Sequence, residues 1–175
     1  MAARIPYKEL PERLARKIPP EGQLNVWRMI AHAEEAWPSW MKFGTMLLTA
    51  TVLAPRLREL IIIRIGHLQN SPYEVAQHDP IARSLGVTDV QLAAVEKGET
   101  TADLGFSETE IVALTAVNEL LADKKVSDQT FSGLHGHLGD RGAVEMFLLV
   151  AQYAGLALFL NALQVDIDPT ARLMM

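Results

Sequence analysis

Residues 55–86 constrain the fold most, because two apolar helical patterns meet there at a short Asn-Ser-Pro junction. Proline suits the first position of a helix, so one helix is expected to begin at Pro55 and the next at Pro72, with Ser71 as its N-cap. Gly86 is a natural left-handed stop after the second helix. The sequence therefore predicts an antiparallel helical hairpin in this part of the chain.

The rest of the chain contains further sequence signals for the starts of helices. Thr88 and Ser107 each begin a capping-box pattern, and Ser127 precedes a further helical segment. No run alternates apolar and polar residues over the length of a strand. We therefore predict an all-α, single-domain helical bundle of roughly seven or eight helices, with residues 1–20 as an N-terminal arm.

The last predicted helix, residues 141–164, is apolar over about the length of a membrane span. It contains polar residues such as Glu145 and lacks flanking positive charge, which favours a core helix and no membrane partner. Apolar residues make up 49% of the chain although aromatic residues make up only 6%. Part of this apolar excess is expected in a homo-oligomer interface formed by residues 38–52 and 143–163.

Several classes of function are disfavoured by composition. The chain has no cysteine, which excludes disulfides, thiolate metal sites and thiol catalysis together. A net charge of −5 without a dense Lys/Arg cluster argues against a nucleic-acid partner. His135 and His137 lie in a glycine-rich stretch without an acidic third ligand, so no metal is expected. The N-terminus lacks the apolar segment of a secretory leader, and a cytoplasmic protein without cofactor is predicted.

Three ionisable side chains fall on the predicted hairpin. Glu59 belongs to the first helix, whereas Glu74 and His78 stand one turn apart on one face of the second. One interpretation is architectural: Glu74 completes a capping box with Ser71, and His78 is an ordinary buried histidine. The other is chemical, because a histidine beside carboxylates in apolar surroundings is suited to proton transfer near neutral pH. The residue pattern leaves both interpretations open.

The chain resembles the carboxymuconolactone decarboxylase and alkylhydroperoxidase D-like superfamily in the order Glu59, Ser71, Glu74, His78 and in the surrounding segments RELIIIRIG and YEVAQHDPIARSLGVTD. The peroxidase branch of that family has a glutamate, a Cys-x-x-Cys pair, and a histidine four residues after the second cysteine. Glu59 and His78 match this pattern, whereas Ser71 and Glu74 occupy the two cysteine positions. Because a hydroxyl cannot replace a thiolate, thiol peroxidase activity is not expected. The resemblance instead implies the decarboxylase side of the family, with lactone and unsaturated-acid substrates from aromatic catabolism, and subunits that assemble as dimers, trimers or hexamers.

The leading prediction is a cofactor-free acid-base lyase of the carboxymuconolactone decarboxylase type, acting on a small lactone or unsaturated carboxylic acid. His78 is predicted to be the main acid-base group, oriented by Glu74, with Glu59 as the second proton carrier. The predicted substrate-binding residues are Trp40, Phe43, Tyr73, Gln77 and His67, with Arg56 or Arg64 as a clamp for a carboxylate. The alternative is a non-catalytic oligomeric binding or scaffold protein of the same fold.

Overall fold

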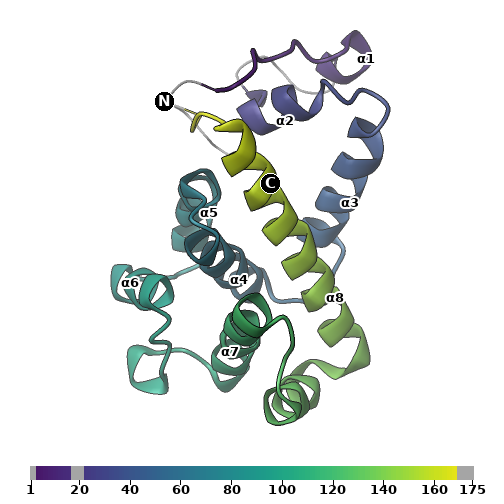
Figure 1. Cartoon of the computed structure of the whole chain (residues 1–175). Coiled ribbons are helices and arrows are strands. Elements are labelled where there is room, and N and C mark those ends of the chain that lie inside the picture. The colour runs from purple at the N-terminus through teal and green to yellow at the C-terminus, as the bar shows by residue number, and fades with distance from the viewer. Residues whose placement is uncertain (1–2, 17–21, 169–175) are drawn as a thin grey trace.

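A computed structural model of the protein describes residues 3–16 and 22–168, and the regular structure in these residues is entirely helical (Figure 1). The predicted all-α fold is thus confirmed. The helices are α1 (Glu12–Ala15), α2 (Asn25–Ile30), α3 (Trp37–Thr49), α4 (Pro55–Leu68), α5 (Pro72–Ser84), α6 (Asp89–Lys97), the short 3₁₀ helix η2 (Ala102–Leu104), α7 (Glu108–Asp123) and α8 (Asp128–Leu163).

Helices α4 and α5 form the predicted hairpin, and each begins with proline at its first position. Every residue of α4 from Leu57 to Gly66 is buried, because α5, α6, α7 and α8 all pack against it. A Cβ atom on Gly66 would lie 2.9 Å from Val75 Cγ2, so glycine is what lets α4 and α5 approach each other here. The hairpin therefore holds its inward side chains at short range.

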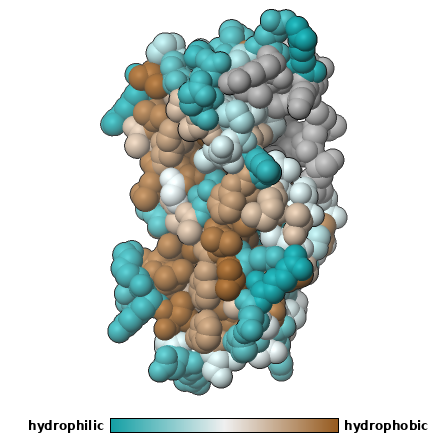
Figure 2. Space-filling view, turned by 90° about the vertical axis from the view of Figure 1, so that its right-hand side faces the viewer, coloured by the Kyte–Doolittle hydropathy of each residue, from teal (hydrophilic) through white to brown (hydrophobic). Residues whose placement is uncertain are grey.

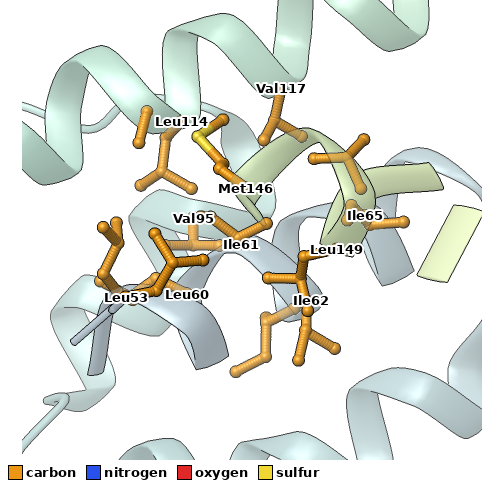
Figure 3. Close-up of a cluster of buried hydrophobic side chains, with 14 of the residues drawn as sticks. Leu53, Leu60, Ile61, Ile62, Ile65, Val95, Leu114, Val117, Met146 and Leu149 are labelled. Carbon is orange, nitrogen blue, oxygen red and sulfur yellow. The ribbon is translucent and has the colours of Figure 1, made fainter. Parts of the chain in front are cut away.

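Two apolar clusters stabilise the bundle. The main cluster joins α4 to α6, α7 and α8 through the side chains labelled in Figure 3, among them Ile61, Leu114 and Met146. The second cluster includes Leu10, Leu24, Trp37 and Leu160, and it packs the N-terminal segments against the end of α8. The Arg4 backbone N–H also donates to the Leu163 carbonyl at 3.0 Å. The described residues 3–16 of the predicted arm thus lie against the bundle, whereas residues 1–2 and 17–20 of that arm are outside the described part of the chain.

Helix α8 is longer than predicted, because it continues from Asp128 through a kink at Gly139, where φ is 64° and ψ is −178°. It is long and apolar enough to cross a membrane by length and composition alone, and 39% of its most apolar stretch is buried. Those buried residues, among them Leu149 and Tyr153, complete the core. Other residues of the helix, among them Val144, Leu148 and Leu158, are exposed.

The helix caps agree with the sequence at three positions and disagree at one. Thr88 and Ser107 form complete capping boxes, and the Ser127 side chain accepts from the Thr130 backbone N–H. The predicted box of Ser71 with Glu74 is wrong, because the Ser71 side chain makes no capping hydrogen bond. The Glu74 carboxyl group instead lies inside the hairpin, 3.5 Å from His78 Nε2.

Candidate active site

The three ionisable residues predicted as catalytic, Glu59, Glu74 and His78, lie together between α4 and α5 and form the acid-base group of the site. The His78 Nδ1–H donates to Glu59 Oε2 at 2.6 Å, and His78 Nε2 lies 3.5 Å from Glu74 Oε2. Their side chains are no more than 4% exposed. When Nδ1 carries the proton that faces Glu59, Nε2 can accept a proton from Glu74. A proton can therefore pass along one line from Glu74 through His78 to Glu59.

Burial raises the pKa of Glu74 to about 7, and the nearby Glu59 adds to this rise although His78 opposes it. The physical cause is the cost of placing a charged carboxylate where water cannot solvate it. Near neutral pH the Glu74 carboxyl group thus exists in both protonation states. A group with these properties is suited to give and take protons.

Two residues that the sequence did not indicate, Arg58 and Tyr153, contact Glu59 and His78 and hold them in place. The Arg58 Nε–H donates to Glu59 Oε1 at 3.3 Å, so both Glu59 oxygens are occupied. The Tyr153 ring, from α8, meets the His78 ring edge-on with centroids 5.3 Å apart. Burial raises the pKa of Tyr153 well above its ordinary value, so its hydroxyl stays protonated. Neighbouring residues on a helix do not normally face each other, so adjacency gave no sign that Arg58 contacts Glu59.

A cavity of about 420 Å³ opens beside these groups, within the range typical of small-molecule sites. Its walls come mainly from α3, α4, α5 and α8, and they are largely apolar. Among the residues lining it are Glu59, Glu74, His78, Arg58, Gln77, Tyr73, Tyr153, Trp27, Trp40, Met41, Leu48, Ile81 and Leu156. The arrangement therefore places proton-carrying groups in the wall of a largely apolar cavity.

Three of the predicted substrate-binding residues, Trp40, Tyr73 and Gln77, do line this cavity. The Tyr73 hydroxyl already donates to Asp168 Oδ2 at 2.6 Å, so Tyr73 forms part of the wall and its proton is engaged elsewhere. The Gln77 side chain is buried, yet its Nε2 and Oε1 have no hydrogen-bond partner among residues 3–16 and 22–168. Buried amide groups are normally paired, so Gln77 is the wall residue best able to receive a ligand.

Phe43 and His67 are corrections to the prediction, because neither lines the cavity. Phe43 packs against the main apolar cluster, whereas Trp40 and Gly44 on the adjacent face of α3 reach the cavity. His67 follows Glu59 by eight residues, a rotation of roughly 80° about the helix axis. It lines a separate open depression on the other side of α5, with Asp79 and Pro80.

Arg56 and Arg64 are also placed away from the cavity, so neither can clamp a substrate carboxylate there. Arg56 donates to Glu110 Oε1 and Gln91 Oε1 at 2.9 and 3.0 Å. Arg64 donates to Asn118 Oδ1 at 2.6 Å and to two carbonyls at the end of α6. Both guanidinium groups thus join helices of the bundle. No cluster of histidine and acidic residues within residues 3–16 and 22–168 is arranged to hold a metal ion.

Comparison with known families agrees with this geometry. Residues 35–119 match the carboxymuconolactone decarboxylase family. This range contains Glu59, Glu74 and His78. This part of the chain is therefore similar to that family. No curated protein sequence matches the chain.

Solved structures show that the whole fold is alkylhydroperoxidase D-like. The alkylhydroperoxidase AhpD core of an uncharacterized peroxidase-related protein from Ralstonia eutropha JMP134 matches with a TM-score of 0.81 at 17% identity, over 95% of this chain and 93% of that one. An uncharacterized peroxidase-related protein from Silicibacter sp. TM1040 matches with a TM-score of 0.79 at 13% identity, over 97% and 93% of the two chains. The debrominase Bmp8, in complex with 2,3,4-tribromopyrrole, matches with a TM-score of 0.77 at 14% identity, over 96% and 95%. At these identities the likeness concerns the fold alone.

Proposed function

We propose that the protein is a cofactor-free acid-base lyase of the carboxymuconolactone decarboxylase type, acting on a small lactone or unsaturated carboxylic acid. The observation that supports this most is the line of Glu74, His78 and Glu59 along the wall of an apolar cavity. A non-catalytic scaffold of the same fold has no need of an open cavity beside these groups. The unpaired amide of Gln77 likewise favours a site that receives a ligand.

Decarboxylation makes two demands that this cavity can meet. The bond between carbon and the carboxyl group breaks, its electron pair enters the conjugated system of the substrate, and carbon dioxide leaves. Apolar walls favour this loss of charge from the reacting carboxylate. A proton must then reach the carbanion-like carbon, and the protonated Glu74 carboxyl group, or His78 beside it, supplies that proton. Glu59 Oε2 lies 2.6 Å from Nδ1 on the opposite side of His78, so the imidazole can relay a proton between the two carboxyl groups.

The experiment is turnover of a γ-carboxylated butenolide in D₂O, followed by NMR for loss of the carboxyl group and entry of deuterium at the protonated carbon. His78→Gln should remove most turnover, since a general acid-base group contributes about 10²–10⁴-fold in rate, and Glu59→Gln should do nearly the same. Circular dichroism should show unchanged helix content in both variants. His67→Gln is the matched control, because His67 belongs to the same hairpin but lies outside the cavity. Full activity of His78→Gln would refute the proposed function.

We also propose that the protein is a cytoplasmic homo-oligomer whose subunits meet along α8. Exposed small or apolar residues follow one another at alternating spacings of four and three along this helix: Val144, Leu148, Ala151, Gly155, Leu158 and Ala162. Val144, Leu148 and Leu158 are 59%, 41% and 59% exposed, and Figure 2 shows a hydrophobic band on the side of the molecule that includes α3 and α8. This spacing is the one by which two helices pack together, and the small residues permit close approach. Helix α8 of a second copy is the proposed partner, because a stripe without charged residues can pack against its own copy.

A further inference from the structure

Arg58 is the arginine of the cavity wall, and most of its guanidinium group is unused. The residue is 6% exposed, and it lines the cavity beside Glu59. Within the described part of the chain, its one hydrogen bond runs from Nε to Glu59 Oε1. An arginine carries five N–H donors, so the four on Nη1 and Nη2 remain for a ligand.

Gln77 provides a second unused polar group in the same wall. Its side chain is buried, and neither Nε2 nor Oε1 has a partner in the described residues. Arg58 directly precedes Glu59 on α4, and Gln77 directly precedes His78 on α5. Both residues line the cavity that Glu59 and His78 also line, one from each helix.

The free donors in the cavity wall favour an anionic ligand. Glu59 already pairs with the Arg58 Nε–H group, whereas the Nη1 and Nη2 groups have no acceptor among the described residues. A buried polar group normally requires a hydrogen-bond partner, and a ligand carboxylate would supply one to Arg58. Arginine also matches the geometry of a carboxylate, because its planar fork can donate two parallel hydrogen bonds.

We propose that Arg58 and Gln77 form a carboxylate-binding subsite that selects substrates with an anchoring carboxylate. This inference rests on the proposed function, since the subsite places such a substrate against the acid-base group. The Arg58 Nη–H groups hold the anion, and the Gln77 Nε2–H group donates to the same carboxylate or to an adjacent oxygen of the substrate. A cation stabilises the charge of the carboxylate that it binds and thereby opposes its loss. The anchored carboxylate is therefore retained, and the reaction takes place at another position of the substrate.

The test compares benzoate with benzamide, which has nearly the same shape and no charge, by calorimetry or by quenching of Trp27 and Trp40 in the cavity wall. The wild-type protein should bind benzoate roughly 10- to 100-fold more tightly, as expected for hydrogen bonds to a charged group. Arg58→Gln should reduce this preference to near parity. Arg56→Gln is the matched control, because Arg56 lies two residues away and its guanidinium group binds Glu110 outside the cavity.

Gln77→Leu keeps the inference testable if Arg58→Gln does not fold, since it leaves the Arg58–Glu59 contact intact. This variant should bind benzoate several-fold more weakly. The subsite would be overturned if the wild type bound the two probes equally or bound neither of them. An unchanged preference in Arg58→Gln, or unchanged benzoate affinity in Gln77→Leu, would also overturn it. Benzoate has no reacting lactone, so a preference for it without turnover of any lactone would refute the proposed function and leave the subsite standing. Turnover without a preference for benzoate would refute the subsite alone.

Discussion

Replacing Glu74 by glutamine should stabilise the protein at pH 8 and change its stability little at pH 5. Burial raises the pKa of this carboxyl group from its ordinary 4.5 to about 7, with a further contribution from Glu59 and an opposing one from His78. Glutamine has nearly the same shape and cannot ionise. The substitution therefore isolates the cost of placing a negative charge at this position.

The direction follows from the number of protons bound by each state. Below pH 4.5 Glu74 is protonated in both the folded and the unfolded protein. As the pH rises from 4.5 to about 7, the unfolded chain releases its proton first, so the stability that protonated Glu74 contributes is progressively lost. Above pH 7 the whole difference is lost, which is about 3 kcal/mol because each pKa unit corresponds to about 1.4 kcal/mol. The Glu74→Gln protein escapes this loss.

Urea unfolding followed by circular dichroism at pH 5 and pH 8 measures the effect. The free energy of unfolding of Glu74→Gln should exceed that of the wild type by up to about 3 kcal/mol at pH 8 and by much less at pH 5. Glu119→Gln is a control, because hydrogen bonds from the Ser127 backbone and from Thr130 lower the pKa of Glu119 and keep it ionised at both pH values. Its effect on stability should be the same at both. An equal effect of Glu74→Gln at pH 5 and pH 8 would show that Glu74 does not titrate near neutrality, and the reasoning would fail.

Three further predictions follow from the caps, the surface and the composition. Ser71→Ala should lower the free energy of unfolding by less than about 1 kcal/mol, or raise it, since no described residue forms a hydrogen bond with the buried Ser71 Oγ; a larger loss in urea unfolding would contradict this. Leu158→Lys should convert the oligomer to monomers in light scattering, whereas Val90→Lys, at an exposed apolar residue on α6, should not; a monomeric wild type at micromolar concentration would count against the α8 interface. The protein should reduce no organic hydroperoxide with a dithiol donor, because it contains no cysteine, and sustained dithiol consumption would disprove this.

Local sequence signals predicted the elements of the hairpin correctly, because proline and glycine act within their own few residues. Pro55 and Pro72 begin their helices as expected, and the left-handed Gly86 follows the second one. The helical period also placed Glu74 and His78 on one face, and the antiparallel hairpin brought Glu59 to that face. These features depend on geometry that is the same in any helix.

The errors concern choices made by tertiary packing. The pattern of Ser71 and Glu74 is a valid capping box by spacing, yet the carboxyl group is 3.5 Å from His78 Nε2 and leaves the cap unused. Arg58, Arg56 and Arg64 look alike along the sequence, and only the packing of α4 decides which of them faces the cavity. A buried helix surrounded on all sides offers no polar face from which this choice could be predicted.

The chemistry open to this site follows from what stands at position 74. Reduction of a peroxide by the family's route requires two thiols, because one sulfur is oxidised and the other resolves it. Here Ser71 has no redox chemistry, and Glu74 has only a proton to exchange. Burial raises the pKa of Glu74 to about 7, because this effect is larger than the opposing effect of His78. The site therefore has no thiol for electron transfer, and Glu74 is a third proton-carrying group beside Glu59 and His78. This inventory supports the proposed protonation of a carbanion-like substrate carbon in the cavity.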